Sequence, residues 1–281
     1  MMAIAVTCIS ASGPMIVATA APALAIAFWR CFIGAGATAP WVLWRHRAEV
    51  RRLTRRELGY AAAAGLLLAA HFAAWIPSLS FTTVASSTAL VATQPVWAAV
   101  IGRIRGAHVP GRAWIGIALS LAGIVVLAGV DFAIDPRALI GDGLALVGAM
   151  LAAAYVTVGQ TARQTMSTGT YTLLAYAISA VALLAVCLVG RQALSGYSAT
   201  AWGLILLLTV TAQLLGHTLM NRVLVTTSAT VVSLAILFEM PGGTLIAALW
   251  LGQVPPWQII PAVALLLTGL VVVIRSARTT P

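Results

Sequence analysis

The sequence predicts an all-α integral membrane protein with ten transmembrane helices, arranged as two inverted five-helix repeats. Three observations lead to this prediction: the apolar composition, an internal duplication, and the uneven distribution of arginine. Of the 281 residues, 61% are hydrophobic and only 8% are charged, and the mean hydropathy is +1.02. These values lie outside the range of soluble globular domains and indicate a polytopic membrane protein.

The duplication has a constant offset of 146 residues, which separates Pro95 from Pro241. The same offset relates four further pairs: Pro110 and Pro256, Gly123 and Gly269, Ser87 and Ser233, His71 and His217. Apolar matches are common by chance in such a composition, but the Pro, Gly and His matches at one gapless offset indicate an internal repeat. We expect the first repeat at residues 1–134 and the second at residues 135–281.

The arginines predict the orientation of the helices. Six of them lie in residues 45–56, between the second and third predicted helices, so this loop is expected to be cytoplasmic. With ten helices and both termini cytoplasmic, Arg137 and Arg191 are the loop arginines left outside. Five is an odd number, so the second repeat enters the membrane in the opposite orientation. Transporters with this architecture bind substrate near the midplane, between the repeats.

Charges, prolines and short polar turns delimit the individual helices, each of which needs about 20 apolar residues to cross. The first helix lacks a basic segment before it, so we expect it to be retained and not cleaved as a signal peptide. The expected ranges are 2–20, 23–44, 58–81, 84–104, 111–130, 141–162, 169–190, 199–221, 227–251 and 256–275.

Several classes of function are disfavoured. The net charge of +10 comes from arginines that mostly flank apolar runs, which is a topology signal and not a nucleic-acid surface. Cys8, Cys31 and Cys187 are isolated and have no metal-ligand spacing, so we expect them in the core. Catalytic and nucleotide-binding motifs do not occur. We expect no catalytic residue, cofactor or metal, and as partners a small-molecule substrate and the lipid bilayer, with no nucleic acid. A monomer is expected, with a dimer as the alternative.

Two charges fall inside predicted helices. Glu239 is the only charge between Arg222 and Arg275, near the middle of the ninth helix, and Arg30 lies in the second. A charge at this depth costs roughly 2.5 to 3.5 kcal/mol and therefore faces a partner or a cavity. Arg30 can pair with Glu239, bind a substrate carboxylate or contact helix-end carbonyls. We favour a structural role for both, with binding of a substrate amine or proton coupling as the alternatives for Glu239.

Polar and aromatic side chains share faces on several predicted helices. On the fourth helix such a face can bind a small zwitterion, or its polar side chains can form hydrogen bonds to neighbouring helices. The duplicated histidines suit proton-linked function, or hydrogen-bonded packing. The two tyrosines line either a cavity or packed interfaces. The predicted substrate-binding residues are His71, Trp75, Ser78, Ser87, Gln94, Trp97, Tyr155, Tyr176, Gln213 and His217.

Several short segments of the chain form a recognisable set: Phe28-Trp29-Arg30, Ala153-Ala154-Tyr155, Glu239-Met240-Pro241, and the glycine-centred runs at Gly123 and Gly269. With these segments and the two five-helix repeats, the chain resembles the EamA branch of the drug/metabolite transporter superfamily over nearly its whole length. The resemblance implies a ten-helix exporter or facilitator of small metabolites, often amino acids, in a bacterial inner membrane, with helices five and ten packed away from the central cavity. In one departure from symmetry, the first-repeat counterpart of Glu239 is Thr93.

The sequence thus predicts a transporter of small amphipathic metabolites, with amino acids or related compounds as the first choice, and not an enzyme. One alternative is an intramembrane enzyme that uses Glu239 with a histidine on a lipid-borne substrate. Another is a carrier of nucleotide sugars or phosphate esters, which requires more cavity cations than Arg30 alone. Substrate identity, ion coupling and direction of flux stay open.

Overall fold

The computed structural model describes residues 2–216, 219 and 237–276, and within these residues every element is a helix. Eight spans in this part of the chain are long and apolar enough to cross a membrane, and α1 and α2 form a shorter apolar segment. The elements are α1 (Met2–Ser10), α2 (Ser12–Ala18), α3 (Ala23–Arg45), α4 (Arg47–Arg51), α5 (Arg55–Ser78), α6 (Val84–Val91), α7 (Gln94–Ile104), α8 (Gly111–Ile134), α9 (Ala138–Ala162), α10 (Thr168–Val189), α11 (Ala199–Leu208), a π-helix (Thr209–Gly216), α14 (Glu239–Leu251) and α15 (Ile259–Ser276).

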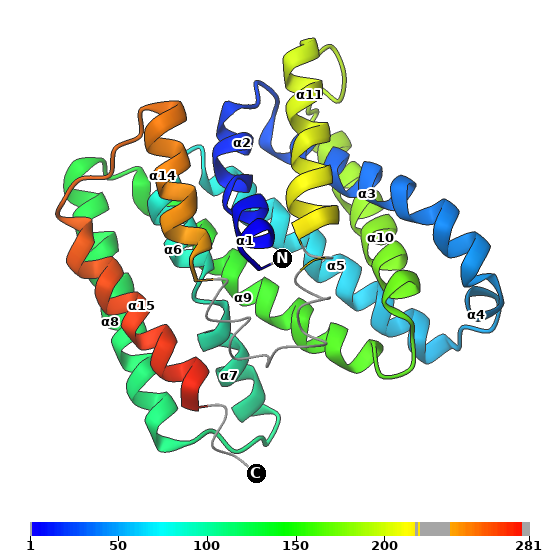
Figure 1. Ribbon diagram of the computed structural model, residues 1–281, viewed down its shortest axis with the longest axis horizontal. Coiled ribbons are helices and arrows are strands. Elements are labelled where there is room, and N and C mark those ends of the chain that lie inside the picture. The colour runs from blue at the N-terminus through cyan, green and yellow to red at the C-terminus, as the bar shows by residue number, and fades with distance from the viewer. Residues whose placement is uncertain (1, 217–218, 220–236, 277–281) are drawn as a thin grey trace.

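The helix pairs follow the ten-helix, two-repeat architecture. The fifth and tenth spans, α8 and α15, lie side by side at one end of the molecule, and the second and seventh, α3 and α10, pair at the other (Figure 1). The fourth and ninth meet through α6 and α14. The third span contacts the sixth through α5 and α9, and the equivalent contact joins the eighth span to the first, through the π-helix and α1. Each helix thus contacts the partner that a two-fold relation between the repeats requires.

Glycines set the close approach of α8 and α15. A Cβ added at Gly116 would lie 2.6 Å from the carbonyl oxygen of Gly269, and one added at Gly269 would lie 2.5 Å from the Ser120 backbone nitrogen. Ser120 also donates from Oγ to the carbonyl oxygen of Leu266 at 3.4 Å. Small residues at a membrane helix crossing let the two backbones touch. Apolar side chains such as Val125 point away from the contact between α8 and α15. The outer surface of this pair is therefore suited to contact lipid.

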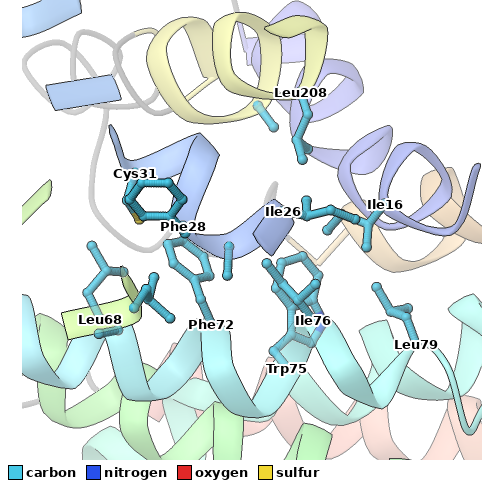
Figure 2. Close-up of a cluster of buried hydrophobic side chains, with 14 of the residues drawn as sticks. Ile16, Ile26, Phe28, Cys31, Leu68, Phe72, Trp75, Ile76, Leu79 and Leu208 are labelled. Atoms are coloured by element: carbon cyan, nitrogen blue, oxygen red, sulfur yellow. The ribbon is translucent and has the colours of Figure 1, made fainter. Parts of the chain in front are cut away.

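The main buried cluster joins α5 to the helices around it (Figure 2). Its α5 side chains recur at steps of four, three, one and three residues, which places them along one face of the helix. In a bilayer, packing of such side chains stabilises helix association, because lipid tails are as apolar as the side chains themselves. The labelled residues of the cluster are Leu68, Phe72, Trp75, Ile76 and Leu79 of α5, Phe28, Cys31 and Ile26 of α3, Ile16 of α2 and Leu208 of α11.

The predicted fourth helix is broken in two. Residues 92 and 93 form a turn between α6 and α7, and Pro95 occupies the second position of α7. The second repeat has a turn at residues 237 and 238, and Pro241 is the third residue of α14. Proline is tolerated in a first helical turn because the N–H groups there have no intrahelical acceptor. Two expectations are therefore corrected: residues 83–97 do not form one continuous helical face, and Glu239 begins a helix instead of lying at mid-helix.

The first predicted helix is also interrupted, at Ala11 between α1 and α2. The break lies against the start of α14, where a Cβ on Gly242 would come within 2.5 Å of the Ser10 Oγ and one on Gly243 within 3.1 Å of the Ser10 carbonyl oxygen. Glycines at these two positions therefore allow α14 to reach the interrupted backbone of the first span.

A short loop helix, α4, is tied to the start of α10. The Glu49 carboxylate accepts a 2.7 Å hydrogen bond from the backbone N–H of Ser167 and lies 3.3 Å from the Nδ1 of His46. Partial burial raises the pKa of Glu49, but the interactions with Ser167, Thr170 and His46 outweigh it, so this pKa lies below its usual value. The ionised carboxylate therefore stabilises this contact between the two repeats.

Candidate functional site

Arg30 lies at the centre of a polar cluster inside the bundle. Its side chain is only 2% exposed. Its Nε donates a 2.7 Å hydrogen bond to the Gln213 Oε1, and the Gln213 Nε2 donates back to the Arg30 carbonyl oxygen at 3.3 Å. The guanidinium carbon lies 4.2 Å from the centroid of the Phe72 ring, a distance at which a cation and an aromatic face attract each other. The Arg30 Nη1 has no hydrogen-bond partner among the described residues.

Two local features of the chain allow this arrangement. A Cβ on Gly34, one helical turn after Arg30, would lie 2.7 Å from the Gln213 Nε2 and 3.2 Å from the Cδ2 of Tyr176. Glycine at this position therefore leaves space for both side chains. Gln213 itself lies in the π-helix that follows α11, and π-helical turns occur frequently at functional sites because they re-aim side chains relative to a regular α-helix.

Tyrosines from α9 and α10 extend this cluster. Tyr176 is buried and interacts electrostatically with Arg30 and with Tyr155. Tyr155 is half-buried and stacks on Tyr171, with ring centroids 6.3 Å apart and planes at 23°. The sequence left packing or cavity lining open for both tyrosines; in the structure Tyr176 interacts with the guanidinium, and Tyr155 interacts with Tyr176.

Glu239 provides the second charge near this cluster. It is half-buried and forms the first residue of α14, where the helix dipole favours a negative charge. It interacts electrostatically with Arg30. No direct ion pair joins them, since the only pair of that length among the described residues is His46 with Glu49. The two membrane charges thus attract each other at a separation longer than that of a direct ion pair, and the Arg30 Nη1 keeps no partner among the described residues.

The first group of predicted site residues lies on α5 and α6. The Nδ1 of His71 lies 2.9 Å from the Gly148 carbonyl oxygen of α9, and its ring stacks on Trp75 within α5 at 5.8 Å between centroids. The hydroxyls of Ser78 on α5 and Ser87 on α6 hydrogen-bond to each other at 2.8 Å, and both side chains are fully buried. His71 and the two serines thus make interhelical contacts, and a role of the four residues in substrate binding stays a prediction.

The second group lies near the break between α6 and α7. Gln94 and Trp97 are half-buried, and the Trp97 Nε1 donates to the Thr93 Oγ1 at 3.1 Å. Their proposed contact with substrate also stays a prediction. His217 lies outside the described residues, so the expected symmetry of the two histidines is untested.

Two functional positions escaped the sequence reasoning. Phe72 supplies the ring under Arg30, yet a phenylalanine in an apolar helix carries no distinguishing signal. Gly34 lies against the side chains of Gln213 and Tyr176, and the sequence does not indicate what approaches a glycine in an apolar helix. Only the tertiary arrangement shows that both residues serve the arginine.

Comparison with known proteins identifies the family. The sequence profile of the EamA-like transporter family matches residues 1–129 and 139–275, two segments that together span nearly the whole chain. The chain belongs to the EamA-like transporter family. This confirms the resemblance to the EamA branch of the drug/metabolite transporter superfamily, and it identifies the molecule as a multi-pass membrane transporter.

Two further comparisons concern relatives of this EamA-like transporter. A solved structure described as "Crystal structure of protein" is similar over 99% of this chain and 97% of its own, with a TM-score of 0.65 and 16% sequence identity. A likeness at that identity supports the fold alone. No curated protein matches the chain in sequence.

Proposed function

We propose that this EamA-like transporter moves small amphipathic zwitterions, amino acids or related compounds, by alternating access around Arg30. The observation that carries the proposal is the pair of opposite membrane charges that interact without touching. The open Nη1 of Arg30 suits a substrate carboxylate, which guanidinium groups bind through strong charge-assisted hydrogen bonds. Glu239 suits the substrate ammonium group. A zwitterion bound between Arg30 and Glu239 can form one ion pair with each of them, whereas the two side chains form no direct ion pair with each other.

The aromatic residues of the cluster support an amphipathic substrate. Phe72 and Tyr176 offer apolar ring surface beside Arg30, and Tyr155 adds a further ring next to Tyr176, as ligand sites commonly combine apolar walls with a few polar groups. Within the described membrane spans, Arg30 is the only buried arginine. A single guanidinium matches one carboxylate better than the several charges of a nucleotide sugar or phosphate ester.

The distribution of these residues between the repeats supports alternating access. Arg30 and Phe72 belong to the first predicted repeat, whereas Tyr176, Gln213 and Glu239 belong to the second. A substrate that contacts both repeats binds with a different affinity when the repeats are arranged differently. This difference in binding free energy shifts the equilibrium between inward-open and outward-open states. We further propose a bacterial inner membrane location with cytoplasmic termini, which the arginine-rich loop at residues 45–56 supports.

Counterflow in proteoliposomes tests the proposal. Vesicles preloaded with unlabelled amino acids should accumulate the labelled compound, and analogues that lack either the amino or the carboxyl group should compete roughly tenfold or more weakly, because each leaves one buried charge unpaired. Glu239→Gln should lose the discrimination against the analogue without an amine. Arg137→Gln, a change at an exposed loop arginine, serves as the control.

Two outcomes count against this assignment. Equal competition by analogues with and without the amino group would remove Glu239 from substrate recognition. Absence of exchange with amino acids, nucleosides and sugars alike would contradict transport of small zwitterions and favour an enzyme acting on a lipid-borne substrate.

A further inference from the structure

Two buried carboxylates lie at the junction of α8 and α9, on residues that do not belong to the Arg30 cluster. Asp131 lies near the end of α8 and Asp142 in the first turns of α9, at the junction of the two predicted repeats, and each is 5% exposed. They interact electrostatically with each other. Asp131 Oδ2 and both carboxylate oxygens of Asp142 have no hydrogen-bond partner among the described residues. Three buried acceptor atoms are therefore unsatisfied in one place.

The surroundings supply oxygen atoms and no compensating cation. The hydroxyl of Thr82 lies near Asp142, and that of Ser86 lies near Asp131. Gly141 presses the start of α9 against the loop after α5, since a Cβ there would lie 2.8 Å from the Ser78 carbonyl oxygen. In the part of the chain that the structure describes, neither carboxylate forms an ion pair with a basic side chain.

Such a group cannot persist as two bare anions. Moving one ionised carboxylate out of water without a partner costs several kcal/mol, and a second like charge nearby adds repulsion. A species of positive charge must therefore enter the pair. Two carboxylates with neighbouring hydroxyls form an all-oxygen ligand set, which suits hard cations such as Ca²⁺ and Mg²⁺ and not the softer transition metals.

We propose that Asp131 and Asp142, with the hydroxyls of Thr82 and Ser86, form a binding site for one divalent alkaline-earth cation. A charge of two on the ion balances the two carboxylates. The bound ion links the end of α8, the start of α9 and the segment between α5 and α6, so it stabilises the junction between the repeats. The site is separate from the Arg30 cluster and does not depend on which substrate is transported.

Equilibrium dialysis of the purified full-length protein against Ca²⁺ tests the proposal, after treatment with a chelator and with ionic strength held constant by choline chloride. We expect one saturable Ca²⁺ ion per chain, competition by Mg²⁺, and a higher midpoint of thermal unfolding in the presence of either ion. Asp131→Asn and Asp142→Asn should each weaken the affinity by roughly tenfold or more. Thr82→Ala keeps both carboxylates and should weaken it less.

Asp135→Asn is the matched control, because Asp135 lies one turn from Asp131, is exposed, and accepts a hydrogen bond from the backbone of Arg137. It should bind Ca²⁺ like the parent. If Asp131→Asn and Asp142→Asn do not fold, the number of Ca²⁺ ions bound by the parent and the Ca²⁺ affinity of Thr82→Ala test the proposal. Absence of saturable binding in the parent overturns the proposal. Unchanged Ca²⁺ binding in the variants of Asp131 and Asp142 also overturns it. So does a thermal midpoint that rises on acidification but not on addition of Ca²⁺ or Mg²⁺, because a shared proton would then neutralise the pair.

Discussion

Replacing Gln213 by leucine removes the acceptor for the Arg30 Nε and the donor to the Arg30 carbonyl oxygen. The Nε hydrogen bond is short, at 2.7 Å, and its donor is a charged group that is 2% exposed. Hydrogen bonds to charged groups contribute about 1.5 to 3 kcal/mol, against an average of about 0.6 kcal/mol for polar contacts between membrane helices. We therefore expect Gln213→Leu to cost about 2 kcal/mol, a factor of about 30 in the folding equilibrium.

Gln213→Glu separates stability from substrate binding. A carboxylate at this position keeps the acceptor and pairs with the guanidinium, so the folded yield should stay near that of the parent. The Arg30 charge would then be compensated inside the protein, and the affinity for a substrate carboxylate should fall. Unfolding in mixed micelles by denaturant measures the first effect, and substrate protection against unfolding measures the second.

The control is Gln192→Leu, because Gln192 lies in an exposed loop and donates only to the nearby Gly190 carbonyl oxygen. It should change stability by less than about 0.5 kcal/mol. The reasoning is refuted if Gln213→Leu unfolds like this control, since the buried guanidinium would then not depend on the glutamine. It is also refuted if Gln213→Glu binds substrate as well as the parent.

Three further predictions concern other regions. Gly269→Ala places a methyl group 2.5 Å from the Ser120 nitrogen, so it should separate α8 from α15 and lower the free energy of unfolding by about 1 to 3 kcal/mol, measured in the same micelles; no loss would show that the crossing is loose. Glu49→Gln should lower the free energy of unfolding by about 1 kcal/mol at neutral pH. Because the pKa of Glu49 is lowered in the folded protein, this difference in stability from the parent should vanish as the pH falls below 4.5, which thermal unfolding at several pH values can measure. A difference that stays constant with pH contradicts the assigned role of the carboxylate. Gln94→Ala and Trp97→Ala should reduce counterflow while abundance in the membrane stays normal, and transport like that of the parent in both variants would assign these side chains to packing.

The sequence alone determined the fold class, because composition and charge placement act through the bilayer itself. An apolar run long enough to cross must form a helix, and arginines must stay in the loops, so helix number and the two-repeat architecture follow without any knowledge of contacts. The offset between Pro95 and Pro241 also marked two equivalent positions in the repeats. It did not show that each proline begins a new helix, because the same residue can kink a continuous one.

The tertiary structure decided which polar residues meet. Arg30 and Gln213 are 183 residues apart in the chain, and helical periodicity assigns faces to single helices but not the partners that those faces contact. Tyr176 thereby joins the arginine and Tyr155 lies next to Tyr176, whereas His71 contacts the backbone of α9. Asp131 directly follows the predicted helix 111–130 and Asp142 is the second residue of the predicted helix 141–162. Neither position marks its residue as buried, since burial depends on the packing of α8 and α9 against α6 and the segment before it. Long-range packing alone makes them a buried pair.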